Sequence, residues 1–408
     1  MSRTRLSLVL TIVIAVVPLA RAAAGARGQI TVLVTDLVAN LPSLADRNGI
    51  VHTPKLVDPN LVNPWGVAEA PTSPFWLADN NAGVSTLYSV PPAGPIAIAP
   101  RIVSIPSPTD PLHRTGTPTG AVFNIDQAGQ GFKVAGVDAN NNAATAPALF
   151  LFATEDGTIV GWNPGVNPSG FQTSLVGNYG IIAVDNSTNP TLANGAVYKG
   201  LAIATDSGGH TFLYATNFRA GTVEVYDSSF KPANLPADAF TDRHLPNGYA
   251  PFNIALIGGR LFVTYAKQDA AKHDDVARPA HGIVDVFDLS GRMLARFTQH
   301  GHLNSPWGLA QAPSSFGDFA GAILIGNFGD GRIHAFDPDS GKFLGAVLNS
   351  RGDEILIDGL WSLQVGNGTN GGDTGTIYFT AGPNGETDGL FGSLTPVEPG
   401  TPCGTPCR

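Results

Sequence analysis

The sequence has little of two things on which many proteins of its length depend, cysteine and charge. Its 408 residues include two cysteines, Cys403 and Cys407, so the fold of the remaining chain cannot depend on disulfide bonds. Only 13% of the residues are charged, and no basic cluster offsets the net charge of −9, which argues against nucleic acid as a partner. The G-x-S-x-G, H-E-x-x-H and P-loop motifs of hydrolases and nucleotide-binding proteins are also absent.

Long apolar runs are scarce as well, and the one that exists lies at the start of the chain. Arg3 and Arg5 precede an apolar run over residues 6–20, and small residues follow it, which is typical of a secretory signal peptide covering residues 1–26. An uncleaved membrane anchor is the alternative, but the run is shorter than the roughly 20 residues that a spanning helix needs. The sequence therefore predicts a secreted, periplasmic or extracellular monomer with no membrane span and a mature net charge of −12.

Glycine and proline, in contrast, are abundant, with 49 and 32 residues, and indicate many tight turns between short strands. A phrase that begins with a Pro/aromatic/Gly triplet recurs six times. The central residues of these triplets are Trp65, Thr119, Lys199, Phe252, Trp307 and Trp361. Their spacings of 54, 80, 53, 55 and 54 residues are typical of a radial or stacked array. The long second interval is interpreted as two insertions, at residues 125–147 and 163–190.

Each repeat contains three or four runs of β-branched and aromatic residues separated by turn residues, which predicts strands. Six such units predict an all-β fold, a six-bladed β-propeller with four-stranded blades that forms a single domain over residues 27–395. The sixth unit lacks a fourth run, whereas residues 30–34 form a run outside any unit, so we expect the N-terminal strand to close the ring. A stacked solenoid is disfavoured because no capping repeat is evident. Residues 396–408 are expected to be a disordered tail.

In a propeller, the loops that enter the first strand and leave the second strand of each blade surround one mouth of the central channel. Polar residues stand at these points of the repeats, namely Asn63, Asn80, Glu155, Asn217, Asn327 and Asp358. Such oxygen-rich groups suit Ca²⁺, which takes 6–8 oxygen ligands, but Asn and Asp also end strands and form turns. Both interpretations stay open. A metal-dependent reaction would also need a base, for which Glu155 and Asp156 are weak catalytic candidates.

A charged insertion interrupts the fourth unit between its second and third predicted strands. Its candidate ligand residues are Lys267, Asp269, His273, Asp274 and Asp275. Loops on a rigid scaffold often carry function, so this segment could bind a ligand or a cation over the channel mouth. The alternative is a solvated loop, the usual fate of a charge run.

Several long phrases, among them LVNPWGVAEAPTSPFWLADNNAGVSTLY and GNFGDGRIHAFDPDSGKFLG, resemble an uncharacterised family of exported bacterial proteins. Many members of that family come from species with the PEP-CTERM/exosortase sorting system, although this chain lacks the Pro-Glu-Pro motif and apolar helix of sorted members. The resemblance covers roughly residues 30–394 and implies a secreted β-propeller with no established activity. The pattern is more distantly similar to NHL propellers and to gluconolactonase-like enzymes, which hold a divalent cation on the channel axis.

The sequence thus leads to two hypotheses of different kinds. The first is an exported propeller that binds a ligand or a protein partner through one face and is not an enzyme. The second is a Ca²⁺-dependent lactonase or esterase with its metal on the channel axis.

Overall fold

The computed structural model describes residues 29–110, 115–169 and 177–397. The predicted signal peptide and most of the predicted tail, with Cys403 and Cys407, lie outside these residues. The prediction of an all-β protein is confirmed, because among the described residues the one α-helix is the single turn α1 (Pro383–Glu386). This part of the chain contains no helix with the length and hydropathy of a membrane span.

Six successive groups of antiparallel strands correspond to the six repeats of the sequence. Their first strands are β5 (Pro64–Ala68), β10 (Pro118–Phe123), β16 (Tyr198–Thr205), β19 (Tyr249–Ile257), β23 (Pro306–Gln311) and β27 (Leu360–Val365). Their second strands are β6 (Phe75–Asp79), β13 (Phe150–Thr154), β17 (Thr211–Asn217), β20 (Arg260–Lys267), β24 (Ile323–Asn327) and β28 (Ile377–Ala381). Their third strands are β7 (Val84–Ser89), β14 (Thr158–Trp162), β18 (Thr222–Asp227), β21 (Ile283–Phe287), β25 (Ile333–Phe336) and β29 (Leu390–Pro396).

A fourth strand is present in five of these groups and differs in length from one group to the next. These fourth strands are β8 (Ala97–Ile98) with β9 (Val103–Ser104), β15 (Ile181–Asp185), β22 (Met293–Gln299), β26 (Phe343–Asn349) and β1 (Ile30–Ala39). The third group has three strands among the described residues. Strand β15 lies inside residues 163–190, so the interpretation of that whole segment as an insertion was wrong. The other insertion contains a hairpin, β11 (Lys133–Val137) with β12 (Ala143–Pro147).

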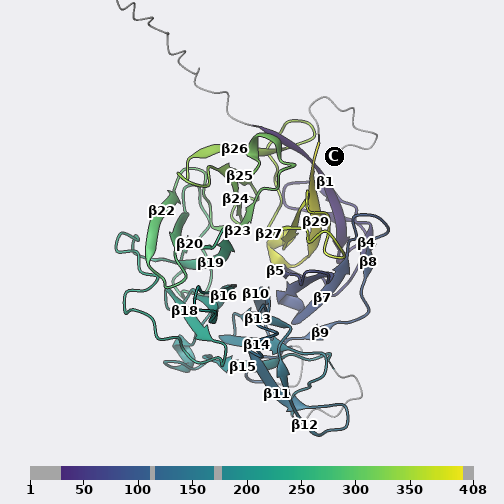
Figure 1. Ribbon diagram of the computed structural model, residues 1–408. Helices are drawn as coiled ribbons and strands as arrows, with labels where there is room; N and C mark the ends of the chain where they lie inside the picture. Colours follow the sequence, from purple (N-terminus) through teal and green to yellow (C-terminus); the bar gives the residue numbers. More distant parts are fainter. Residues whose placement is uncertain (1–28, 111–114, 170–176, 398–408) are drawn as a thin grey trace, which may run out of the picture.

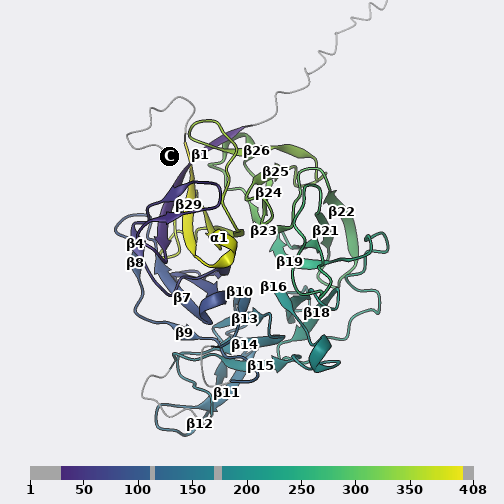
Figure 2. The ribbon, with the colours of Figure 1, turned by 180° about the vertical axis from the view of Figure 1, so that it is seen from behind.

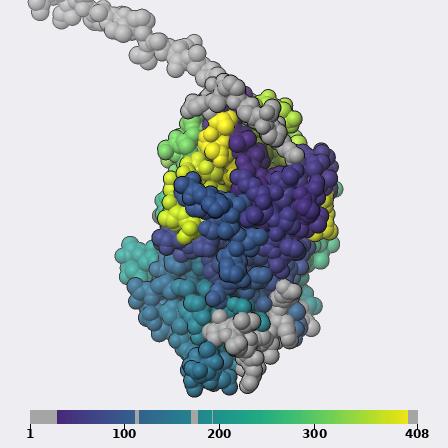
Figure 3. All heavy atoms as spheres, turned by 90° about the vertical axis from the view of Figure 1, so that its right-hand side faces the viewer, coloured from purple at the N-terminus to yellow at the C-terminus, as the bar shows by residue number. Residues whose placement is uncertain are grey.

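The first strands of the six groups lie around a common centre, with the later strands outside them (Figure 1). Each first strand contacts the first strand of the next group, and β27 contacts β5. Strand β1 pairs antiparallel with β29 and, over three residues, parallel with β26. Residues from the two ends of the described chain therefore lie side by side, as the purple and yellow surfaces show (Figure 3). Short strands β2 (Leu44–Ala45), β3 (Val51–His52) and β4 (Leu56–Val57) follow β1.

The recurring triplets mark the points where the first strands approach one another most closely. A Cβ atom on Gly66 would lie 2.4 Å from the carbonyl oxygen of Thr119, and one on Gly120 would lie 2.4 Å from the backbone nitrogen of Leu201. Because a side chain at either position would collide with the neighbouring backbone, these two repeats require glycine there, whereas the fourth and sixth carry Asn253 and Ser362 at the equivalent position. The register of the first and second strands also shifts at these positions.

The conspicuous aromatic residues of the triplets pack against one another rather than between the sheets of one repeat and the next. Trp65 stacks on Trp361 with ring centroids 3.5 Å apart, and Trp307 meets both rings edge-on. Phe252 and Phe218 join the same buried group. We call this group, with Phe328, the aromatic plug. Its members come from five of the six repeats, so it lies where the first strands converge.

Candidate functional site

A buried lysine forms the centre of a charged cluster on one side of the aromatic plug. Lys199 lies on β16 and is only 1% exposed. Its Nζ lies 4.9 Å from the centre of the Trp65 ring and 5.9 Å from that of Phe218, within the range of cation–π contact. The same ammonium group pairs with the carboxylate of Glu155 and lies 3.4 Å from Oδ1 of Asp274. The plug thus supports one cation held between two carboxylates from different repeats.

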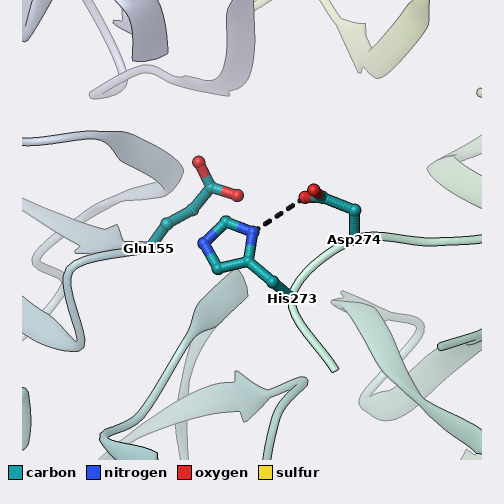
Figure 4. A group of neighbouring side chains, drawn as sticks. All are labelled: Glu155, His273 and Asp274. Carbon is teal, nitrogen blue, oxygen red and sulfur yellow. Dashed lines mark hydrogen bonds and ion pairs between the residues drawn. The ribbon is translucent and has the colours of Figure 1, made fainter. Parts of the chain in front are cut away.

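Glu155 and His273 lie close together although the sequence separates them widely. Glu155 follows the end of β13, and its Oε2 accepts a hydrogen bond of 2.9 Å from Nδ2 of Asn80. His273 belongs to the loop between β20 and β21, and its Nδ1 donates to Oδ1 of Asp274 at 2.9 Å. Figure 4 shows the His273 ring between the two carboxylates. We call Glu155, Lys199, His273 and Asp274 the charged mouth.

The charges of this cluster hold one another in the ionised state. Burial alone would lower the pKa of Lys199, but Glu155 and Asp274 more than offset it, so that pKa is raised above its usual value. The hydrogen bond from His273 is the main cause that lowers the pKa of Asp274 to about 2, and the same bond raises the pKa of His273. The mouth therefore holds a permanent ammonium and an ionised Asp274 at neutral pH.

A second carboxylate group borders the charged mouth from the last repeat. Glu386 lies at the end of α1, which faces the viewer near the centre in Figure 2. Its Oε2 accepts a hydrogen bond of 2.8 Å from Nδ2 of Asn63, whose own Oδ1 accepts from the indole nitrogen of Trp361. Burial, with repulsion from Glu155, raises the pKa of Glu386, although the bond from Asn63 opposes the shift.

The remaining predicted ring residues have partners outside the charged mouth. Asn217 accepts from two backbone N–H groups and donates to Glu224, and Asn327 bridges the backbone of Asn304 and His302. Asp358 forms an ion pair with Arg47 at 2.6 Å. Of the six ring residues, the structure therefore joins Asn80 and Glu155 by a direct hydrogen bond and places Asn63 at the neighbouring Glu386. Asn217 and Asn327 have partners within their own repeats, as expected for strand ends and turns, whereas Asp358 pairs with Arg47 near the start of the described chain.

Two further sets of predicted residues have separate roles: Asp156, which follows β13, and the rest of the charged insertion between β20 and β21. Oδ2 of Asp156 accepts bonds from the backbone nitrogen and hydroxyl of Thr117, and burial raises its pKa. Within the insertion, Asp269 accepts from the backbone nitrogen of His273 and shapes the loop, whereas Lys267 donates to the carbonyl of Asn247. Burial also raises the pKa of Asp275.

These donors fit a ring of calcium ligands poorly. His273, Glu155 and Asp274 offer one atom each within 4.8 Å of one another, but imidazole is not a typical Ca²⁺ ligand. The Lys199 ammonium already contacts both carboxylates, and two of the predicted amide ligands are committed elsewhere. A divalent ion would have to displace that ammonium group.

Sequence reasoning missed Lys199 and Glu386 as members of the site. Lys199 occupies the central position of its triplet, where four of the other five repeats carry Trp or Phe. The signal available in the sequence was this lysine at a triplet position that is otherwise mostly aromatic. Glu386 lies in the connection between the second and third strands of the last repeat, the place that η1 (Asn80–Ala82) occupies in the first repeat, but five residues beyond the end of β28, so the strand exits did not align it.

The fold and the site together define an all-β repeat protein with a charged cluster over an aromatic centre. No family model matches the chain. It is 32% identical over 342 residues to uncharacterized protein L690 of Acanthamoeba polyphaga mimivirus. This alignment covers 83% of this chain and 81% of that protein. Uncharacterized protein R648 of the same virus is 31% identical, over 85% of this chain and 77% of its own. The chain belongs to the family of these two proteins.

Solved structures of other proteins align with most of this chain. A glucose dehydrogenase aligns with a TM-score of 0.47 and 12% identity, over 84% of this chain and 98% of its own. A streptogramin B lyase aligns with a TM-score of 0.39 and 12% identity, over 83% of this chain and 95% of its own. Neither similarity assigns an activity to this chain.

Proposed function

We propose that this protein is a six-bladed β-propeller in which β1 closes the ring as the outer strand of the sixth blade. The cyclic order of contacts among β5, β10, β16, β19, β23 and β27 supports six blades around one axis. The antiparallel pairing of β1 with β29, the third strand of the last repeat, supports closure. The third blade has three of the expected four strands.

We further propose that the protein is exported and binds a ligand through the charged mouth. The basic and apolar pattern of residues 1–26 supports export. One observation carries the binding proposal: Glu155, Lys199 and Asp274 come from three repeats and meet at one point over the plug. Burying a lysine with a largely buried carboxylate rarely improves stability over apolar packing, so the pair of Lys199 and Glu155 supports a functional site here.

The unused hydrogen-bonding groups of the mouth favour a cationic ligand. Nζ of Lys199 is committed to Glu155, Asp274 and the Trp65 ring. In contrast, Oδ2 of Asp274 and Oε1 of Glu386 have no hydrogen-bond partner among the described residues, and the Asp274 side chain is 67% exposed. A mouth with surplus acceptors and negative charge selects donors. The ligand that fits is a primary ammonium or guanidinium group, either free or on a protein partner.

Calorimetric titration with putrescine, a small diamine, tests this assignment. Asp274→Asn and Glu386→Gln each remove one negative charge and are expected to weaken the affinity about fivefold or more. Asp238→Asn is the matched control, because Asp238 is also about 70% exposed but lies in the segment after β18.

The proposal fails if putrescine does not bind or if the control weakens binding as much as the mouth variants. Stoichiometric Ca²⁺ binding that is lost in Asp274→Asn and strengthened in Lys199→Met would instead favour the metal-dependent alternative. Turnover of a lactone that is lost in Glu155→Gln would favour an enzyme.

A further inference from the structure

The end of the channel opposite the charged mouth contains a separate cavity. Its volume is about 590 Å³, and residues of all six first strands β5, β10, β16, β19, β23 and β27 line it. Cavities of 300–1,000 Å³ are typical of small-molecule sites. Because every repeat contributes to the wall, the cavity is built by the ring as a whole rather than by one loop.

The wall of this cavity is nearly free of charge: most of its residues are apolar, and polar atoms contribute about half of the exposed wall. Leu201, Ile254 and Leu309 are examples of the side chains that line it. Glu69 is the single ionisable residue of the lining, and its Oε1 accepts a hydrogen bond of 3.1 Å from Nε2 of Gln364. No cation is present to pair with an anionic ligand, and burying an unpaired charge is costly. The lining therefore selects against an anionic occupant, and burial, which raises the pKa of Glu69 to about 8, leaves it without a fixed negative charge to pair with a cation at neutral pH.

Large apolar side chains are also exposed at this cavity. Ile125 follows β10 and is 49% exposed, and Leu256 on β19 is 41% exposed. Only a few large hydrophobic side chains among the described residues reach such exposure, and these two lie at the same cavity. Exposed apolar residues that gather at a concave surface commonly mark a binding site.

The aromatic plug separates this cavity from the charged mouth. Trp307 belongs to the plug and lines the cavity, whereas Trp65 of the same group contacts Lys199 from the other side. The plug is buried and tightly stacked, so a ligand at one end does not reach the other. The two ends of the channel therefore differ in chemistry, one rich in charge and one nearly free of it.

We propose that this cavity binds an uncharged small molecule with a hydrocarbon body, such as an acyl or isoprenoid chain. The apolar side chains of the wall, with Ile125 and Leu256, would cover the hydrocarbon, at a gain of about 25 cal/mol for each Å² removed from water. Uncharged amides, such as that of Gln364, can meet a hydroxyl or carbonyl group at its end. The size of the cavity matches a small molecule rather than a protein surface.

Fluorescence titration with N-phenyl-1-naphthylamine, a neutral apolar probe, tests the proposal on the full mature chain. One probe is expected to bind per chain, and decan-1-ol should displace it at least about tenfold better than decanoate, since a carboxylate has no partner in the wall. The double variant Ile125→Glu with Leu256→Glu is expected to weaken probe binding about fivefold or more. Both positions are exposed, so the variant should fold.

Leu294→Glu is the matched control, because Leu294 is 42% exposed on β22 and does not line the cavity. Sedimentation with phosphatidylcholine vesicles separates two sources of the hydrocarbon. Vesicle binding that the double variant abolishes supports a chain taken from a bilayer, and probe binding without vesicle binding supports a free molecule. Absence of probe binding, equal displacement by decanoate, or equal loss in Leu294→Glu would overturn the proposal.

Discussion

At the scale of single residues, Lys199 shows how one exception in a repeat can create a site. Its triplet position carries Trp65, Phe252, Trp307 or Trp361 in four other repeats, and those side chains fill the centre of the ring. A lysine at the equivalent point keeps its apolar stem in the same environment and presents its ammonium group to Glu155. The central triplet positions thus supply both the aromatic plug and the place for a buried cation.

Lys199→Met should destabilise the protein by about 2–4 kcal/mol in urea unfolding, because it leaves a largely buried Glu155 without its partner. Adding Glu155→Gln should recover part of this loss, since the unpaired charge is then removed as well. Lys231→Met, at an exposed position, is the control and should change stability by less than about 0.5 kcal/mol. An unchanged stability of Lys199→Met would contradict a buried ion pair.

Glu69 predicts a pH dependence of stability at the other end of the channel. Burial raises its pKa to about 8 from a usual 4.5, against the opposing bond from Gln364. The folded protein therefore holds a proton that the unfolded chain releases above pH 4.5, so the contribution of Glu69 to stability falls as the pH rises from 4.5 through 8.

Glu69→Gln removes this titration. We expect its stability relative to the wild type to rise by about 2 kcal/mol between pH 5 and pH 8.5, a value reduced for the partial exposure of the side chain. Urea unfolding at both pH values measures the difference. Glu354→Gln, at an exposed ion pair with Arg332, should show no comparable change. Equal pH profiles for Glu69→Gln and the wild type would show that Glu69 ionises normally.

At the scale of elements, the loop between β20 and β21 differs from its counterparts in the other repeats. Its charge run singled it out in the sequence, and the structure places His273 and Asp274 beside Lys199. The sequence could not tell which of its charges face the channel, because the turn that Asp269 organises decides this. Lys267 and Asp269 therefore shape the segment, whereas His273 and Asp274 reach the mouth.

The strand ends show the same difference between what the sequence pattern predicts and where the fold places a side chain. The repeat correctly placed Asn80 and Glu155 at corresponding strand exits, and they share a hydrogen bond across two repeats. Asn217 and Asn327 lie one residue earlier in the register of their strand pairs, level with Asp79 and Thr154, and bond to the backbone of their own repeats. An offset of one residue turns a side chain to the opposite side of a strand, and the sequence pattern did not resolve it.

At the scale of the whole molecule, β1 joins the two ends of the described chain. It covers the outer edge of β29 over most of its length and buries side chains such as Val32 and Val38. Without β1, the last sheet would have an open edge and the contacts with β26 would be lost. The N-terminal strand should therefore matter far more than its position near the start of the chain implies.

Two truncations separate this role from that of the preceding residues. A chain that begins at Gln29 keeps β1 and should unfold like the mature protein. A chain that begins at Asn40 lacks β1 and should lose roughly 5–10 kcal/mol, comparable to the whole stability of a typical domain, and fail to unfold cooperatively. Thermal unfolding followed by circular dichroism compares the two. Similar melting curves would show that β1 is dispensable for the fold.

The sequence by itself determined the strands and the six repeats, because these follow from local periodicity and turn chemistry. It also indicated the strand ends and the charged insertion as places for function. Only the tertiary structure decided that Lys199 holds Glu155 and Asp274 together, and that a cavity nearly free of charge lies beyond the plug. Those features depend on distances between repeats, and such distances are set by the packing of the whole ring.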